Sequence, residues 1–233
     1  MIGRLAYLSL LATQGLWASR RTPRLPPARG STGGTVGAGV PLSLLAIGDS
    51  IIEGVGVTET RDALPARLAL ALSRRGAGEV RWQAVGRNGA RSTWVLAQLG
   101  QLEGDPDLVV ISNGINDVTT TRPEHAVLER LLAVVDAAGQ RFPHALIVQL
   151  GLPPLGGFPA LPQPLRRTLG RRADRIDEAL GERVRHAARV LHLPFDQMPD
   201  PDQFASDGYH PDESGVAVWA ESLAPRLLER LLP

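Results

Sequence analysis

The sequence predicts an α/β protein built on a parallel β-sheet with helices on both faces. Short apolar runs typical of buried strands alternate five times with longer stretches that repeat apolar residues every three or four positions. The chain has 233 residues, of which 43% are hydrophobic and 21% are charged, so one domain with a sizeable core is expected.

Five strands and five main helices are expected in alternation along the chain. Each predicted strand is a compact apolar run, and these runs cover residues 42–47, 80–85, 108–111, 145–150 and 190–193. The predicted helices cover residues 63–75, 92–102, 123–138, 165–187 and 213–232. Pro123 suits the first position of a helix because its fixed φ matches the first turn. In open parallel sheets, functional side chains gather at the carboxyl ends of the strands.

Two segments precede the predicted domain at residues 42–233. In residues 1–19, Arg4 is followed by an apolar run that Gln14 interrupts. A positive residue before an apolar run is typical of a signal peptide or a membrane anchor. The run is short for a membrane span, which needs about 20 apolar residues. Residues 20–41 are rich in Arg, Pro and Gly and are expected to be a linker. We expect an exported protein or one associated with a membrane through its N-terminal segment; a plain soluble start is the third alternative.

Composition excludes several kinds of chemistry. Every basic residue is Arg, so no lysine is present to form a Schiff base or a Ser–Lys pair. The absence of Cys excludes disulfides, thiolate nucleophiles and Cys-ligated zinc. A formal net charge of +1 gives no strong field to attract nucleic acid. Gly54-Val55-Gly56 lacks the third Gly of a dinucleotide fingerprint. We therefore expect no cofactor and no nucleic-acid partner.

Polar residues suited to acyl transfer follow four of the five predicted strands. They lie in residues 48–51, 88–90, 113–117 and 206–211. Because the carboxyl ends of parallel strands meet at one edge of the sheet, these four segments are expected to converge there.

Ser50, His210 and Asp207 are the candidates for a nucleophile, its base and the group that orients the base. A serine hydroxyl is a weak nucleophile until a base takes its proton, and imidazole titrates near neutral pH. Asp207 lies three residues before His210, so a turn can bring the carboxylate to the ring. The candidates for stabilising an oxyanion are the backbone N–H groups of Ser50 and Gly89 and the side-chain amide of Asn116.

The four segments resemble the sequence blocks of the SGNH or GDSL hydrolases, a family of lipases and esterases. Residues 48–51 resemble the first block, with Ile51 where Leu is commoner. Residues 89–92, 114–117 and 207–210 resemble the second, third and fifth blocks. The resemblance extends from about residue 44 to residue 219.

The resemblance implies a fold and a set of roles. The implied fold is a flavodoxin-like three-layer α/β/α sandwich, in agreement with the alternation of strands and helices. The implied triad is Ser50, Asp207 and His210, and the implied oxyanion hole is Ser50, Gly89 and Asn116. Gly86 is a rival for Gly89, because the second block is the least distinctive of the four.

Apolar residues flank the predicted site and suggest an acyl substrate. The candidates for substrate contact are Ile51, Ile115, Trp94, Leu152 and Phe158. A wall of apolar groups suits an acyl chain better than a sugar. We expect a serine esterase or lipase for acyl esters, such as a lysophospholipase or a short-to-medium-chain esterase. The alternative that these residues only pack the loops stays open.

Other functions stay open as well. A carbohydrate O-acetyl esterase would share the fold and the triad but would have a polar cleft. A non-catalytic binding module could keep the fold, with Ser50 serving only as a turn or helix-capping residue. Asp207, His210 and Asp212 could together ligate a metal. No further His lies nearby in the sequence to complete the ligand set, so no metal site is expected.

Overall fold

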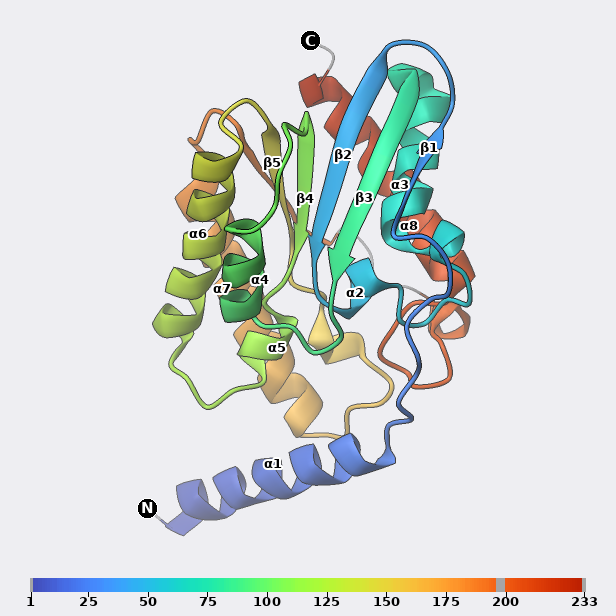
Figure 1. Ribbon diagram of the computed structural model, residues 1–233. Helices are drawn as coiled ribbons and strands as arrows, with labels where there is room; N and C mark the ends of the chain where they lie inside the picture. The colour runs from blue at the N-terminus through green and yellow to red at the C-terminus, as the bar shows by residue number, and fades with distance from the viewer. Residues whose placement is uncertain (1, 196–199, 232–233) are drawn as a thin grey trace.

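A six-stranded sheet forms the middle layer of the computed structural model, which describes residues 2–195 and 200–231 (Figure 1). The strand order is β1-β3-β2-β4-β5-β6; β2 to β6 run parallel, and β1 runs antiparallel to β3. The strands are β1 (Gly33–Val36), β2 (Pro41–Gly48), β3 (Glu79–Gly86), β4 (Leu108–Ser112), β5 (Leu146–Leu150) and β6 (Val190–Leu193). The predicted α/β class with a parallel sheet between helices is confirmed.

The prediction of five strands is wrong, because the sheet has a sixth strand inside the segment expected to be a linker. Gly33 of β1 is paired with Gln83 of β3, and Val36 is paired with Val80. Two of the four residues of β1 are glycines, which are depleted in strands, so the segment carries no pattern of its own. The strand forms because the edge of β3 offers unpaired backbone groups.

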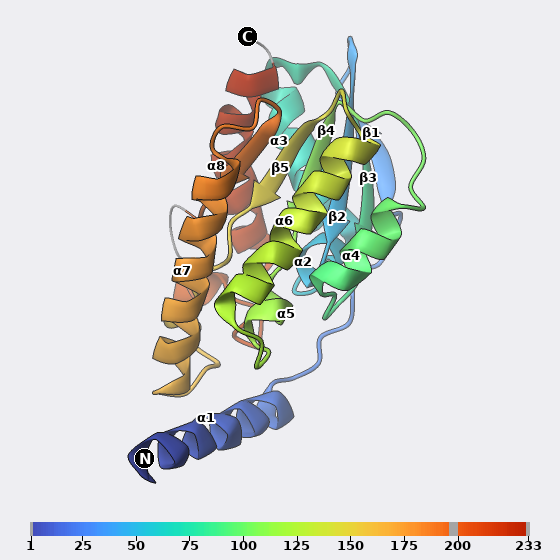
Figure 2. The same ribbon diagram turned by 90° about the vertical axis from the view of Figure 1, so that its left-hand side faces the viewer.

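Helices cover both faces of the sheet and complete the three layers (Figure 2). The helices α3 (Leu64–Leu72) and α8 (Glu213–Leu231) pack on one face, and α4 (Ser92–Leu99), α6 (Glu124–Arg141) and α7 (Leu165–Val184) pack on the other. All residues of β4 and β5 are buried, which explains why their sequences are mostly apolar rather than alternating, with Ser112 and Gln149 as the polar exceptions.

Short helices and turns occupy the loops. They are α2 (Ser50–Glu53), α5 (Ile115–Val118), η1 (Thr60–Asp62), η2 (Ser73–Ala77), η3 (Leu155–Gly157) and η4 (Pro201–Gln203). Some predicted helix ends were displaced. The helix α4 ends at Leu99, before Gly100, and Pro123 caps α6 instead of starting it. Position 232, the expected end of the last helix, lies outside the described residues.

The N-terminal segment forms the helix α1 (Ile2–Arg21). Figures 1 and 2 both show α1 at the end of the molecule where the parallel strands terminate. Within residues 2–195 and 200–231, no helix has the length and apolar content that a bilayer crossing requires.

Candidate active site

The side chains of Ser50, His210 and Asp207 form one hydrogen-bonded chain at the carboxyl edge of the sheet. The Nε2 atom of His210 lies 2.8 Å from Oγ of Ser50, and its Nδ1 atom lies 2.6 Å from Oδ2 of Asp207. An ionised carboxylate only accepts hydrogen bonds, so the proton of the neutral imidazole is on Nδ1. The Ser50 hydroxyl therefore donates to Nε2, which is the geometry that proton removal from the serine requires.

Asp207 is buried and is held as the charged form. Burial alone raises the pKa of a carboxyl group, but hydrogen bonds from His210 and from two backbone N–H groups outweigh it, so the pKa of Asp207 is lowered. Its Oδ1 atom accepts from the N–H groups of Tyr209 (2.9 Å) and His210 (3.1 Å). These bonds close the turn that brings the carboxylate to the imidazole ring.

Asp49 fixes the start of the helix that carries Ser50. Its Oδ1 atom accepts from the backbone N–H of Ile51 (3.2 Å) and from the hydroxyl of Ser112 at the end of β4 (3.1 Å). The carboxyl is buried, and burial raises its pKa to about 6 even though these hydrogen bonds and the charge of His210 lower it. Asp49 thus braces the turn and ties Ser50 to the neighbouring strand.

The loops after β3 and β4 are joined by side-chain hydrogen bonds. Asn116 donates from Nδ2 to the carbonyl of Ala90 (3.0 Å). The buried carboxylate of Asp117 accepts from the backbone N–H (2.9 Å) and the hydroxyl (3.0 Å) of Ser92, and Asn113 also donates to that hydroxyl (3.1 Å). Asn113 and Asp117 therefore act as braces, and they hold Asn116 beside the loop that contains Gly89.

The structure distinguishes the two candidate glycines. Gly89 has a φ of +74°, and a Cβ atom built there would meet nothing within 4 Å, so this backbone faces open space. A Cβ atom on Gly86 would lie 2.2 Å from the backbone nitrogen of Glu53. Gly86 is therefore required for the packing of β3 against α2, and Gly89 is the one whose backbone a substrate could approach.

Asp212 does not join His210 as a metal ligand in this structure. Its Oδ1 atom accepts from the N–H groups of Ser214 and Gly215, both at 2.9 Å, at the start of α8. This is the position of a helix cap. Among the described residues, no three side chains of His, Asp or Glu are grouped so that they could hold a metal ion.

A cavity of about 1570 Å³ opens at these side chains. Ser50, Asn116, Asp207 and His210 all contribute to its lining. Three of the five residues predicted to contact substrate also line it: Ile51, Ile115 and Phe158. The ring of Phe158 packs edge-on against the rings of Phe204 and Tyr209, with centroids 5.8 and 5.9 Å away.

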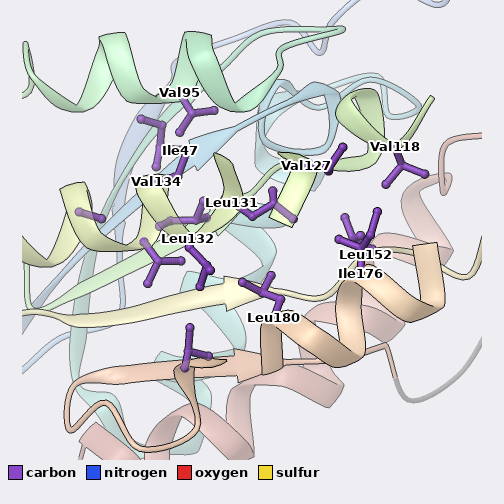
Figure 3. Close-up of a cluster of buried hydrophobic side chains, with 14 of the residues drawn as sticks. Ile47, Val95, Val118, Val127, Leu131, Leu132, Val134, Leu152, Ile176 and Leu180 are labelled. Atoms are coloured by element: carbon purple, nitrogen blue, oxygen red, sulfur yellow. The ribbon is translucent and has the colours of Figure 1, made fainter. Parts of the chain in front are cut away.

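The structure does not place Trp94 or Leu152 in this lining. Leu152 is 5% exposed and lies among the core side chains between the sheet and α7 (Figure 3). Trp94 packs against the same core, and the guanidinium of Arg87 lies 6.0 Å from the centre of its ring. Leu152 is part of the core and Trp94 covers its edge, and the apolar character of the two residues does not reveal these positions in the sequence.

The helix α1 contributes to the cavity, which was not predicted from its sequence. Leu8, Leu11 and Gly15 line it together with the catalytic candidates. The side chains of Thr22, just after α1, and Tyr209 share a hydrogen bond, and burial raises the pKa of the Tyr209 phenol. The spacing of the small and apolar residues in α1 was a usable signal, but the segment was interpreted as a signal peptide or an anchor.

The three-layer fold places the linked serine, histidine and aspartate side chains together at one edge of its sheet, an arrangement found in serine hydrolases. The model of the GDSL-like lipase/acylhydrolase family matches residues 46–218. The chain therefore belongs to this family, and the resemblance found in its sequence blocks is confirmed.

Known proteins agree with this assignment. GDSL-like esterase Rv1075c of Mycobacterium tuberculosis is 29% identical over 198 residues, which are 81% of this chain and 62% of that protein, so the chain spans less than two thirds of this relative. A member of the lipolytic G-D-S-L family from Veillonella parvula has a TM-score of 0.63 at 14% identity, over 81% of this chain and 99% of its own. A family two carbohydrate esterase from Clostridium thermocellum also has a TM-score of 0.63 at 14% identity, over 82% of this chain and 64% of its own. These two structures support the fold.

Proposed function

We propose that this chain hydrolyses carboxylic esters through a covalent acyl-enzyme on Ser50. The observation that carries the proposal is the continuous hydrogen-bonded chain from Asp207 through His210 to Ser50, placed in the lining of a large cavity. A serine activated in this way attacks an ester carbonyl, and the family is one of lipases and acylhydrolases.

Each member of the triad has a defined task in this proposal. His210 takes the proton from Ser50 as the serine oxygen bonds to the carbonyl carbon, and it then gives that proton to the leaving alcohol. A water molecule, deprotonated by the same imidazole, attacks the acyl-enzyme and releases the acid. Asp207 keeps the Nδ1 proton in place and stabilises the imidazolium, because its lowered pKa leaves it ionised at neutral pH.

Three donors are proposed to stabilise the oxyanion. They are the backbone N–H groups of Ser50 and Gly89 and the side-chain amide of Asn116. The amide of Asn116 has two N–H bonds, and one of them is directed to the carbonyl of Ala90. That bond orients the amide, so the other N–H can serve a substrate oxygen without reorganisation.

We propose an acyl ester with an apolar chain, for example a lysophospholipid or another fatty acyl ester, as the substrate. The support is the lining of the cavity, which combines Ile51, Ile115 and Phe158 with further leucines and prolines. An acetylated carbohydrate is the second candidate, because the structurally similar Clostridium thermocellum protein is described as a carbohydrate esterase. The lining also contains Asn88, Asn116 and Thr119, whose polar groups could contact a sugar, so a substrate series is needed to separate the two candidates.

A substrate series on purified wild type and Ser50→Ala tests the proposal. Wild type should hydrolyse p-nitrophenyl esters of fatty acids, and Ser50→Ala should lower kcat by at least about 10³-fold with an unchanged circular dichroism spectrum. Ser222→Ala is the matched control, because Ser222 also lines the cavity but lies on α8, away from the hydrogen-bonded chain. Equal turnover by Ser50→Ala would favour a binding module. A strong preference for acetylated sugars would refute the lipid substrate.

A further inference from the structure

One face of α1 lines the cavity that holds Ser50 and His210. The residues of this face recur every three or four positions, so they lie on one side of the helix. They are Leu8, Leu11, Ala12, Gly15, Leu16, Ala18 and Ser19. No acidic residue occurs anywhere in α1, and no basic residue lies between Leu5 and Ser19, so the central part of the face carries no charge.

Specific contacts hold α1 against the domain. Gln14 donates from Nε2 to the carbonyl of Gln163 (2.6 Å), and its Oε1 atom accepts from the backbone N–H of Leu165 (3.0 Å). The hydroxyls of Tyr7 and Thr168 are 2.8 Å apart. Ala18 is only 4% exposed. These contacts connect α1 to the start of α7 and fix which side of α1 faces the cavity.

We propose that α1 forms the outer wall of the acyl-chain site. The aliphatic chain of the ester lies between the uncharged face of α1 and the apolar residues beside Ser50, such as Ile115 and Phe158. This inference rests on the proposed ester hydrolysis. It assigns to α1 the selection of chain length, since a chain must extend away from the ester group to reach the helix.

Gly15 gives direct access to this wall. A Cβ atom at Gly15 would meet nothing within 4 Å, and its φ is outside the left-handed region, so a larger side chain can be placed there without backbone strain. Such a side chain would occupy cavity volume. Gly3 is also in α1 and has equally open surroundings, but it does not line the cavity, which makes it a matched control.

The test compares Gly15→Phe with Gly3→Phe in the full chain. For each variant, kcat/KM is measured with p-nitrophenyl acetate and with p-nitrophenyl dodecanoate. Gly15→Phe should lower kcat/KM for the dodecanoate at least about 10-fold and change that for the acetate less than about 2-fold, because only the long chain needs the filled space. Gly15→Ala should give an intermediate loss, and Gly3→Phe should match wild type with both esters.

Binding of dodecanoate, measured by calorimetry, gives a readout that does not depend on turnover. Gly15→Phe should weaken it about 10-fold or more relative to wild type and Gly3→Phe. The assignment of α1 would be overturned if Gly15→Phe kept the wild-type kcat/KM for both esters and the wild-type affinity for dodecanoate. An equal loss of kcat/KM with both esters would overturn it as well. If wild type cleaves no ester, the proposed function fails separately, and the binding result still decides whether α1 lines an acyl site.

Discussion

Asp49 has the most unusual titration behaviour of the residues around Ser50. Burial raises its pKa from 3.8 to about 6, so the folded state holds the proton more tightly than the unfolded state does. Binding of this proton stabilises the folded state. The stabilisation is complete below the pKa of the unfolded state, 3.8, and is lost as pH rises through the folded pKa of about 6. A shift of this size corresponds to roughly 3 kcal/mol.

Replacing Asp49 by Asn should remove this pH dependence, because an amide keeps the acceptor oxygen for Ile51 and Ser112 but does not ionise. We expect the free energy of unfolding of Asp49→Asn, relative to wild type, to rise by up to roughly 3 kcal/mol between pH 4 and pH 7. Urea unfolding at each pH measures the difference. Parallel stability curves for the two proteins would contradict the buried, protonated carboxyl.

At the scale of elements, the contact between β3 and α2 sets the position of Ser50. Gly86 allows this contact, since any side chain there would collide with the backbone of Glu53. Gly86→Ala should therefore destabilise the protein by about 3 kcal/mol or more, because the backbone atoms it meets cannot move without displacing α2. The loss is measured as the change in the free energy of unfolding.

Gly89→Ala is the comparison for that substitution. Position 89 has open surroundings, and its only cost is the left-handed backbone, about 1–2 kcal/mol. Equal destabilisation by the two substitutions would show that Gly86 is not packed as described.

The elements also show what the sequence could and could not predict. The strands β4 and β5 were predicted within one residue at each end, because a strand buried on both faces is a nearly continuous apolar run. The partly buried β6 was predicted from its Val and Leu residues. The strand β1 was missed because its pairing depends on a neighbour far along the chain rather than on its own residues. The docking of α1 depends in the same way on Gln163 and Leu165, about 150 positions away.

Within the candidate site, the sequence predicted which polar side chains converge better than it predicted where apolar side chains pack. Ser50, Asp207 and His210 were expected to converge, and their side chains do form one hydrogen-bonded chain. Trp94 and Leu152 were expected at the substrate, but Leu152 lies in the core and Trp94 packs against it. Four polar segments that follow parallel strands must meet at one edge of the sheet, whereas an apolar residue in a loop can face either the cavity or the interior.

At the scale of the whole molecule, the parallel sheet brings together groups that are 160 positions apart in the chain, Ser50 and His210. The strands β2, β3 and β4 end side by side, in register at Gly48, Gly86 and Ser112. The loops that follow them carry Ser50, Gly89 and Asn116. One edge of the sheet therefore carries the proposed nucleophile and the candidate oxyanion donors, and the segment before α8 adds the proposed base.

Labelling with a fluorophosphonate tests the central claim most directly, since this reagent bonds to a serine only when a base activates it. Intact mass and peptide mapping of the treated wild-type protein should show one adduct, on Ser50. Under the same conditions, His210→Ala should be labelled at least about 10²-fold more slowly. An unlabelled wild type, an adduct on a different residue, or equal labelling rates with and without His210 would contradict the account.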